Sequence, residues 1–284
     1  MTKKEHYIDL HVHTSCSDGE RSLKETIEDA KKAGLSAVAI TDHNGFTVEQ
    51  TIRDEDLEII PGVEFSTTYF YGENRKAEIH IIGLFFEGVT PKLNSLFEGI
   101  NKMAYIEAIL DKLDELGMTV TMKELEEQNP DSRQFGRTQI ADILVKKGYA
   151  VDRADAMDRW IGNRSPYFIH SLDCIHYIEM ESCVQEICRY GGFPILAHPF
   201  HYKFTDAQIE ELVMRFRNAS AQPLGIEVYY RDYCDNRIAF LNGLAEKYRL
   251  FPSAGSDRHK ANHPFAQGQY KLLERIKEIH KAFP

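Results

Sequence analysis

Long apolar runs are missing from the sequence. No stretch approaches the roughly 18 consecutive apolar residues that a membrane-spanning helix needs. The first five residues, MTKKE, are polar, whereas a secretory signal peptide carries an apolar core. We therefore expect a soluble, cytoplasmic protein without a membrane partner.

Cysteine is scarce and basic charge is in deficit. Five cysteines, an odd number without a C-x-x-C pair, predict reduced thiols and exclude a disulfide framework. Lys and Arg number 34 against 44 Asp and Glu, so that the formal net charge is −10. This balance excludes a protein that wraps nucleic acid through a general basic surface, although it allows a local basic pocket. We expect a small phosphorylated substrate and no long nucleic acid.

What the sequence does contain is an alternation of strand-like and helix-like segments. Its 284 residues, 43% hydrophobic and 27% charged, suffice for one large barrel or two modest domains. Short apolar or β-branched runs predict strands at residues 7–13, 36–41, 57–65, 78–86, 194–197, 224–230 and 250–254. Helical periodicity lies between or after them at 22–33, 206–217, 235–247 and 269–282. The alternation indicates parallel βα units, hence an α/β barrel or a doubly wound sheet.

The segment from residue 91 to residue 189 breaks this alternation, because its pattern is helical throughout. Candidate helices cover 101–116, 122–128, 137–147, 153–160 and 175–190. The segment is too long for a crossover connection. We therefore expect residues 91–189 to form a helical insert that caps the active site of a barrel built from residues 1–90 and 190–284. Between residues 131 and 170 the insert holds seven Lys and Arg against five Asp, in an otherwise acidic chain.

Histidines and acids gather where the predicted strands end. In residues 7–13 side chains alternate, so that His11 and His13 share one face. Barrels of α/β type place their active sites at this edge of the sheet. Nine side chains at or near the strand ends form the candidate site: His11, His13, Asp18, His43, Glu64, His80, His198, Asp257 and His259. Each alone has a simpler explanation as a polar core or turn residue. Together they predict a metal cluster with nitrogen and oxygen ligands, which suit zinc, manganese or iron in multinuclear hydrolases.

The motifs that carry these residues resemble those of one known family. DLHVHTSCSDG, AITDHN, PGVEFS, HIIGLFF, AHP and GSDRH together look like the motifs of the PHP (polymerase and histidinol phosphatase) family, in order from residue 9 to residue 259. The resemblance implies a distorted (β/α)7 barrel, in agreement with the seven strands counted above. The inserted α-helical subdomain resembles that of the stand-alone phosphoesterase branch, which includes nucleotide phosphatases and a 5′–3′ exoribonuclease.

The resemblance also distributes the nine ligands among up to three divalent metal ions, which would be manganese, iron or zinc. The first ion would be held by His11, His13, Glu64 and Asp257. The second would share the bridging Glu64 and be completed by His80 and His198. The third would be held by Asp18, His43 and His259. Glu64 and Asp257 are the two ligands to which we assign catalytic roles.

The implied activity is hydrolysis of a phosphate ester by a hydroxide held between the metals. The substrate would be a phosphomonoester or cyclic phosphate of a small metabolite or nucleotide. The leading alternative is a 5′–3′ exonuclease that acts on short RNA. A C–N hydrolase of the amidohydrolase type fits less well, because those barrels usually bridge their metals with a modified lysine where this chain has Glu64. The complete ligand set also disfavours a non-catalytic metal-binding domain.

Substrate-binding residues are expected in the insert and in the later barrel loops. Arg137 matches the arginine of the family's insert motif, and its planar guanidinium fits two phosphate oxygens. Gln139 stands where many relatives have a histidine, and Arg231 lies just after the sixth strand, where relatives often have another. His201 follows His198 by three residues. We expect Arg137, Gln139, His201 and Arg231 to contact the substrate.

Overall fold

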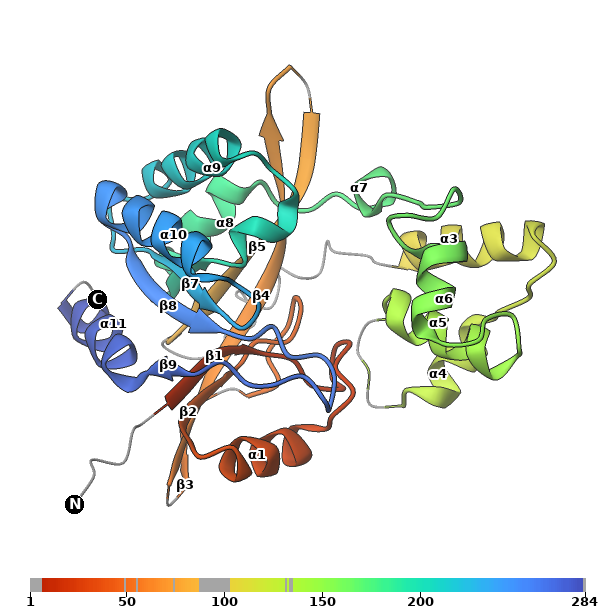
Figure 1. Cartoon of the computed structure of the whole chain (residues 1–284), viewed down its shortest axis with the longest axis horizontal. Coiled ribbons are helices and arrows are strands. Elements are labelled where there is room, and N and C mark those ends of the chain that lie inside the picture. The colour runs from red at the N-terminus through yellow and green to blue at the C-terminus, as the bar shows by residue number, and fades with distance from the viewer. Residues whose placement is uncertain are drawn as a thin grey trace.

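The computed structural model describes residues 7–48, 50–54, 56–73, 75–86, 103–130, 132 and 135–282. In chain order its elements are β1 (Tyr7–Val12), α1 (Leu23–Lys32), β2 (Leu35–Ile40), β3 (Ile52–Asp54), β4 (Leu57–Tyr71), β5 (Arg75–Leu84), α3 (Met103–Glu115), α4 (Met122–Gln128), α5 (Arg137–Lys146), α6 (Arg153–Ala156), the π-helical turn η1 (Met157–Ile161), α7 (Ser171–Cys174), α8 (Met180–Arg189), β6 (Phe193–Leu196), the 3-10 turn η2 (Pro199–Tyr202), α9 (Asp206–Asn218), β7 (Gly225–Tyr230), α10 (Asp235–Tyr248), β8 (Phe251–Gly255), β9 (Gly268–Gln269) and α11 (Tyr270–Ala282). Figure 1 shows a body of sheet and helices with a smaller helical part at its side.

Eight strands form a nearly closed, barrel-shaped sheet. Their order is β8-β7-β6-β5-β4-β2-β1-β9, and the short β3 pairs with β4. β1, β2 and β4 are parallel neighbours, as are β6, β7 and β8. The sheet closes between the segment after β8 and β1, where the Asp257 amide donates to the His11 carbonyl at 2.9 Å and Val12 bridges to Arg258. The α/β barrel expected from the sequence is thus confirmed.

Among the seven strands predicted from the sequence, one departs from the parallel pattern. β5 pairs antiparallel with both β4 and β6. The cause is the connection, because β4 continues to Tyr71 and turns within a few residues, with Gly72 at a φ of 53°, into β5. A parallel neighbour would need a crossover of about a dozen residues or more. The long hairpin projects from the barrel at the top of Figure 1, and His80 therefore lies within β5 rather than at the end of a parallel strand.

Helices cover the barrel from outside. α8, α9 and α10 bury apolar side chains against β4 to β7 in one hydrophobic cluster. α11 adds Leu273 and Ile276 to a second cluster with side chains of β1, β2, β4, β5 and β6. α1 packs on β2, and its N-cap is Ser22, whose hydroxyl accepts from the Glu25 amide in a capping box. These helices cover the outside of the barrel, and the histidines and acids of the candidate site lie at one end of it.

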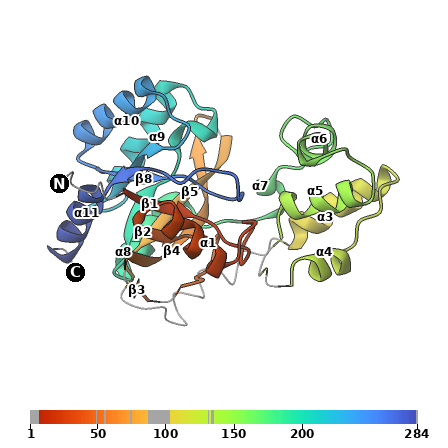
Figure 2. The ribbon, with the colours of Figure 1, turned by 60° about the horizontal axis from the view of Figure 1, so that its bottom comes forward.

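The helices α3 to α7 form a separate part with a hydrophobic core of its own. Leu113, Leu125, Ile140 and Leu144 are among its buried residues. Figures 1 and 2 both show this insert beside the barrel. α8, which the sequence assigned to the insert, instead packs in the barrel's cluster. We therefore propose an insert boundary near residue 179 instead of 189. The other expected boundary, between residues 90 and 91, lies outside the described residues.

The expected helix at residues 175–190 begins only at Met180. The Ile178 carbonyl accepts from the Thr68 amide, and Glu179 forms a bridge with Thr68, so the preceding residues pair with β4 in extended form. α7 was not predicted, and the helix expected at residues 153–160 is divided into α6 and the π-helical turn η1. None of the helices among the described residues is long and apolar enough to cross a membrane. The five cysteines are free thiols.

Candidate metal centre

The nine expected ligands come together at one end of the barrel. They lie on β1 and the loop after it, after β2, on β4, on β5, after β6 and after β8. The loop after β1 folds around the buried carboxylate of Asp42, which accepts from the Thr14 amide at 2.7 Å and from the Ser17 hydroxyl at 2.6 Å. These bonds aim the neighbouring Asp18 at the histidines.

Glu64 lies at the centre of the cluster and is fully buried. Its two oxygens face five imidazoles at 2.9–3.2 Å: His11, His80 and His198 at Oε1, and His13 and His43 at Oε2. Because both oxygens of one carboxylate are engaged by different histidines, Glu64 has the geometry of a bridging ligand.

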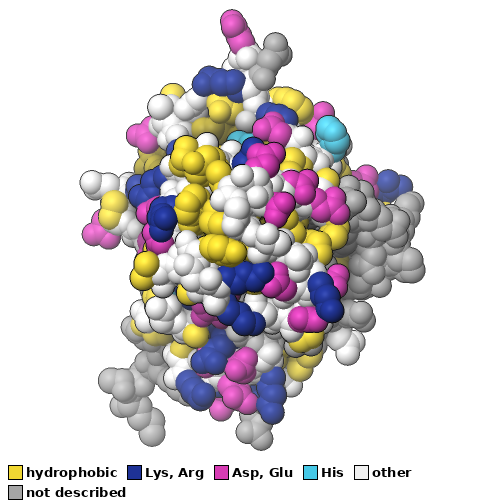
Figure 3. Space-filling model, turned by 90° about the vertical axis from the view of Figure 1, so that its right-hand side faces the viewer, with side chains coloured by type: hydrophobic (Ala, Val, Ile, Leu, Met, Phe, Trp, Pro, Cys, Tyr) yellow, Lys and Arg dark blue, Asp and Glu magenta, His cyan; other side chains and the backbone are white. Residues whose placement is uncertain are grey.

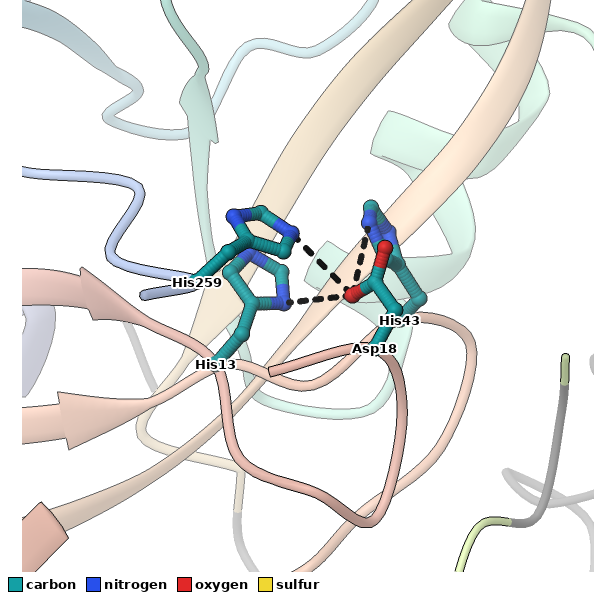
Figure 4. Close-up of side chains that lie close together, drawn as sticks. All are labelled: His13, Asp18, His43 and His259. Atoms are coloured by element: carbon teal, nitrogen blue, oxygen red, sulfur yellow. Dashed lines mark ion pairs between the residues drawn. The ribbon is translucent and has the colours of Figure 1, made fainter. Parts of the chain in front are cut away.

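Two further carboxylates extend the cluster. Asp257 Oδ1 lies 3.2 Å from both His13 Nε2 and His259 Nδ1 and 3.5 Å from His11 Nε2. Asp18 Oδ1 lies 3.0 Å from His259 Nε2 and 3.8–3.9 Å from His43 and His13, as the dashed lines in Figure 4 show. The three acids and their histidines thus form one continuous site.

Four groups within the cluster have donor atoms close enough to share an ion. They are His11, His13, Glu64 and Asp257; His13, Asp18, His43 and His259; His43, Glu64 and His80; and His198, His201 and Asp257. The first two contain the sets expected for the first and third metals. In the third, His43 joins Glu64 and His80, whereas the sequence placed His198 there; His198 Nε2 nevertheless lies 3.0 Å from Glu64.

The spacing of these atoms fits a set of metal ligands. A divalent ion bound at about 2.0–2.2 Å holds adjacent ligand atoms about 2.8–3.6 Å apart in tetrahedral or octahedral geometry. The Nε2 atoms of His11 and His13 lie 3.1 Å apart, although two imidazole nitrogens can share at most one proton. Glu64 Oε2 is buried without a hydrogen bond of good geometry in the described part of the chain. An all-nitrogen-and-oxygen set of this kind suits zinc, iron or manganese.

The acids of the cluster are held in their charged form. Burial alone would raise the pKa of Glu64, but the charges of His11, His80 and His43 outweigh it and keep the pKa well below its usual range. Burial likewise opposes ionisation of Asp257, and His259 and His11 overcome it, so that its pKa is also well below normal. Both side chains are therefore anionic carboxylates at neutral pH, the form in which a carboxylate can bind a metal ion.

Two glutamates that sequence reasoning missed touch ligand histidines. Glu227 Oε1 on β7 lies 3.1 Å from His11 Nδ1, and Glu78 Oε1 on β5 lies 3.3 Å from His80 Nε2. For Glu227 the sequence did contain a signal. It is the single acid within the apolar strand GIEVYY, and a buried charge requires a partner. Carboxylates in this position orient metal-binding imidazoles in many proteins.

A cavity of about 650 Å³ opens from the cluster toward the insert. Asp18, Glu64 and Asp257 line its floor, and residues of the insert and of the β4–β5 hairpin line its walls. This volume is within the range of small-ligand sites. On the face of the molecule in Figure 3, basic and acidic side chains are interspersed among the coloured atoms, without one large basic surface.

Two of the four expected substrate-binding residues line this cavity. Arg137, the first residue of α5, donates to Asn163 Oδ1 at 2.5 Å, and its guanidinium lies 5.3 Å from the centre of the Phe168 ring. Asp142 pairs with Arg153 and leaves Arg137 without an acidic partner among the described residues. His201 stacks on the ring of His198, with 4.9 Å between ring centres. Both side chains face the space above the metal ligands.

The other two are used to hold loops, and neither lines the cavity. Gln139 is buried; its Oε1 accepts from the Gly136 amide at 2.9 Å and its Nε2 donates to the Ser17 carbonyl at 3.1 Å. Arg231 donates to the Asp257 carbonyl at 3.2 Å and pairs with Asp232. In this structure Gln139 and Arg231 bond to loops beside the cavity, and the substrate contacts expected for them stay predictions.

Comparisons with known proteins agree with this arrangement. The profile of the PHP domain matches residues 9–151. A 5′–3′ exoribonuclease of Haemophilus influenzae is 27% identical and covers 100% of this chain and 98% of its own. A phosphoribosyl 1,2-cyclic phosphate 1,2-diphosphodiesterase of Eggerthella lenta is 26% identical over 88% of this chain and 93% of its own. A 3′,5′-nucleoside bisphosphate phosphatase of Chromobacterium violaceum is 26% identical over 89% of this chain and 87% of its own.

A solved structure supports the fold. The structure of an amidohydrolase from Chromobacterium violaceum with bound sulfate superposes with a TM-score of 0.76, at 22% identity, over 96% of each chain. At this identity the likeness establishes the barrel and its insert, and the activity has to be argued from the site.

Proposed function

Since the chain belongs to the PHP domain family, we propose that it is a metal-dependent phosphoesterase that hydrolyses phosphate esters of small metabolites or nucleotides. The observation that carries the proposal is the convergence of nine histidine, aspartate and glutamate side chains, with Glu64 at their centre, at the floor of a cavity. Relatives that act on a cyclic phosphate and on a nucleoside bisphosphate support the substrate class.

The cluster offers ligands for up to three divalent ions, manganese, iron or zinc. His11, His13, Glu64 and Asp257 would hold the first, Glu64 with His80 and His198 the second, and Asp18, His43 and His259 the third. Such ions, when bound, stabilise negative charge on phosphoryl oxygens and favour deprotonation of a water molecule at neutral pH.

The remaining side chains bind and orient the ester. Arg137 presents a planar fork at the cavity wall that can hold two phosphate oxygens, and its bond to Asn163 and its position over Phe168 fix the direction of the fork. His201, stacked on His198, faces the same space and can donate a hydrogen bond to the leaving oxygen.

A second candidate is exonucleolytic cleavage of short RNA. The cavity continues past the metal ligands to Lys76 of the hairpin and to Lys203 and Phe204 after η2. Lys76 and Lys203 add positive charge to the cavity wall, which further phosphate groups of a short RNA could contact. The exoribonuclease from Haemophilus influenzae, which aligns over the whole chain, makes the same substrate class a reasonable alternative.

A substrate panel tests the proposal. Protein loaded with manganese is incubated with phosphomonoesters, cyclic phosphates, nucleoside 3′,5′-bisphosphates and short 5′-phosphorylated RNA, and released phosphate or nucleotide is quantified. We expect turnover of at least one small ester, with loss of turnover in an Asp257→Asn variant prepared in parallel. Preferential cleavage of RNA would favour the second candidate, and turnover of no phosphate ester would contradict both.

A further inference from the structure

Glu227 occupies the interior of the barrel without belonging to any of the four candidate ligand groups. It lies in the middle of β7 and is 0% exposed. Burial of a carboxylate is costly unless several hydrogen bonds satisfy its oxygens. The contacts of Glu227 therefore indicate what its charge is used for.

Each oxygen of Glu227 contacts a different ligand residue. Oε1 lies 3.1 Å from His11 Nδ1, and Oε2 accepts from the backbone amide of His198 at 2.7 Å. The opposite nitrogen of His11, Nε2, faces Glu64 and Asp257. When Nε2 serves as a ligand its lone pair must be free, so the ring proton must reside on Nδ1. The Nδ1–H group then donates a hydrogen bond to Glu227 Oε1.

The contact with His198 acts on the backbone. His198 has a φ of 26° and a ψ of 62°, a left-handed conformation that a non-glycine residue adopts only when its surroundings hold it. The short bond to Glu227 Oε2 restrains this peptide, and the imidazole of His198 points at Glu64 as a result. One carboxylate thus controls the side chain of one ligand and the main chain of another.

The neighbouring strand is shaped to admit this carboxylate. A Cβ atom on Gly255 of β8 would lie 1.9 Å from Glu227 Oε1 and 2.5 Å from His11 Cβ. Any larger residue at position 255 would displace Glu227 or His11. The glycine therefore leaves the space in which the two side chains meet.

From these contacts we infer that Glu227 is a positioning residue of the metal centre, which sets the tautomer of His11 and the turn at His198. The inference rests on the proposed metal-binding function. A glutamine cannot replace it, because both oxygens face hydrogen-bond donors and an amide offers only one acceptor oxygen.

The test compares Glu227→Gln with a charge-matched control, Glu58→Gln. Glu58 lies on β4 and binds Lys277, away from the ligands. Zinc affinity is measured by competition with a chelator, and the histidine side-chain NMR spectrum is recorded for zinc-loaded, ¹⁵N-labelled protein. We expect Glu227→Gln to weaken zinc binding about 10–100-fold and to shift or remove the Nδ1 proton signal of His11, while Glu58→Gln retains both.

Equal zinc affinity of wild type and Glu227→Gln would overturn the inference and leave the proposed function intact. If wild-type protein binds neither zinc nor manganese nor iron, both the inference and the proposed function fall. Should Glu227→Gln not fold, the wild-type spectrum alone decides, since a proton on Nε2 of His11 in place of Nδ1 would contradict the role assigned to Glu227.

Discussion

Individual side chains of the metal centre balance charge in a buried space. Two carboxylates, Glu64 and Asp257, face six imidazoles between them. The convergence of these side chains could be predicted because histidines and acids are conspicuous at the ends of apolar strands. The roles of Glu227 and Gln139 could not, because they depend on how closely segments distant in sequence approach each other.

Replacing Glu64 tests its bridging position. Glu64→Gln removes the negative charge that faces five histidines. It also removes an anionic oxygen from the two candidate ligand groups to which Glu64 belongs. We expect kcat/KM with the best substrate to fall by several orders of magnitude and the metal content, measured by elemental analysis, to fall as well. Glu58→Gln serves as the control. Near-normal turnover in metal-replete Glu64→Gln would refute the assignment.

Replacing Arg137 tests the proposed phosphate contact. Without the guanidinium fork, Arg137→Ala should lose about 2–4 kcal/mol of transition-state stabilisation, as for one preorganised donor. Arg137→Lys should recover only part, since an ammonium group cannot bind two oxygens in the same plane. Arg164→Ala, an exposed insert arginine paired with Asp158, is the matched control. Metal content should remain unchanged, and a wild-type kcat/KM in Arg137→Ala would leave Arg137 without its proposed role.

At the level of secondary-structure elements, local sequence predicted most of the barrel. Strands with continuous β-branched and apolar residues and helices with clear caps, such as α1, lie close to the expected residues. The antiparallel β5 and the late start of α8 were missed. In both cases pairing with the long β4 determines the conformation of the segment. This pairing joins separate segments of the chain, so that the local hydrophobic periodicity does not predict it.

The contact between the insert and the loop that carries Asp18 offers a test at this scale. Gln139 of α5 and Ser132 both donate to the Ser17 carbonyl, and Arg153 pairs with Glu20. Gln139→Leu removes one of these bonds and the cap at Gly136, which should cost about 1–3 kcal/mol of stability. We also expect weaker binding of the metal ion that Asp18 would hold. Thermal unfolding and metal content measure the two effects.

The control for this variant is Gln208→Leu. Gln208 closes the same kind of capping box at the start of α9 on the barrel, and its capping bonds are made with Thr205. It should lose stability without loss of metal. If Gln139→Leu retains the full metal content, the insert does not support the Asp18 loop in the way proposed.

On the scale of the whole molecule, the net charge of −10 limits how the protein can bind its substrate. The metal centre and Arg137 supply attraction locally, inside a cavity of about 650 Å³. Nothing in the charge balance provides the many phosphate contacts on which polynucleotide binding depends. The acidic exterior therefore favours small substrates.

The salt dependence of turnover follows from this charge distribution. Each phosphate neutralised by a protein cation adds to the loss of affinity with rising salt. We expect kcat/KM for the best substrate to change only weakly between roughly 50 and 200 mM salt. A steep loss, of the size expected for about 6–10 phosphate contacts, would instead indicate a polynucleotide substrate.

The central claim is that turnover depends on divalent ions held by the nine candidate ligands, of which Glu64 is the central one. Metal-free protein is titrated with manganese, and hydrolysis of the best substrate is followed together with bound metal. We predict no turnover before metal is added and a rise that saturates at up to three ions per chain, the number that the ligand sets allow. Full turnover in the metal-free protein, or saturation with no more than one tightly bound ion, would contradict this account.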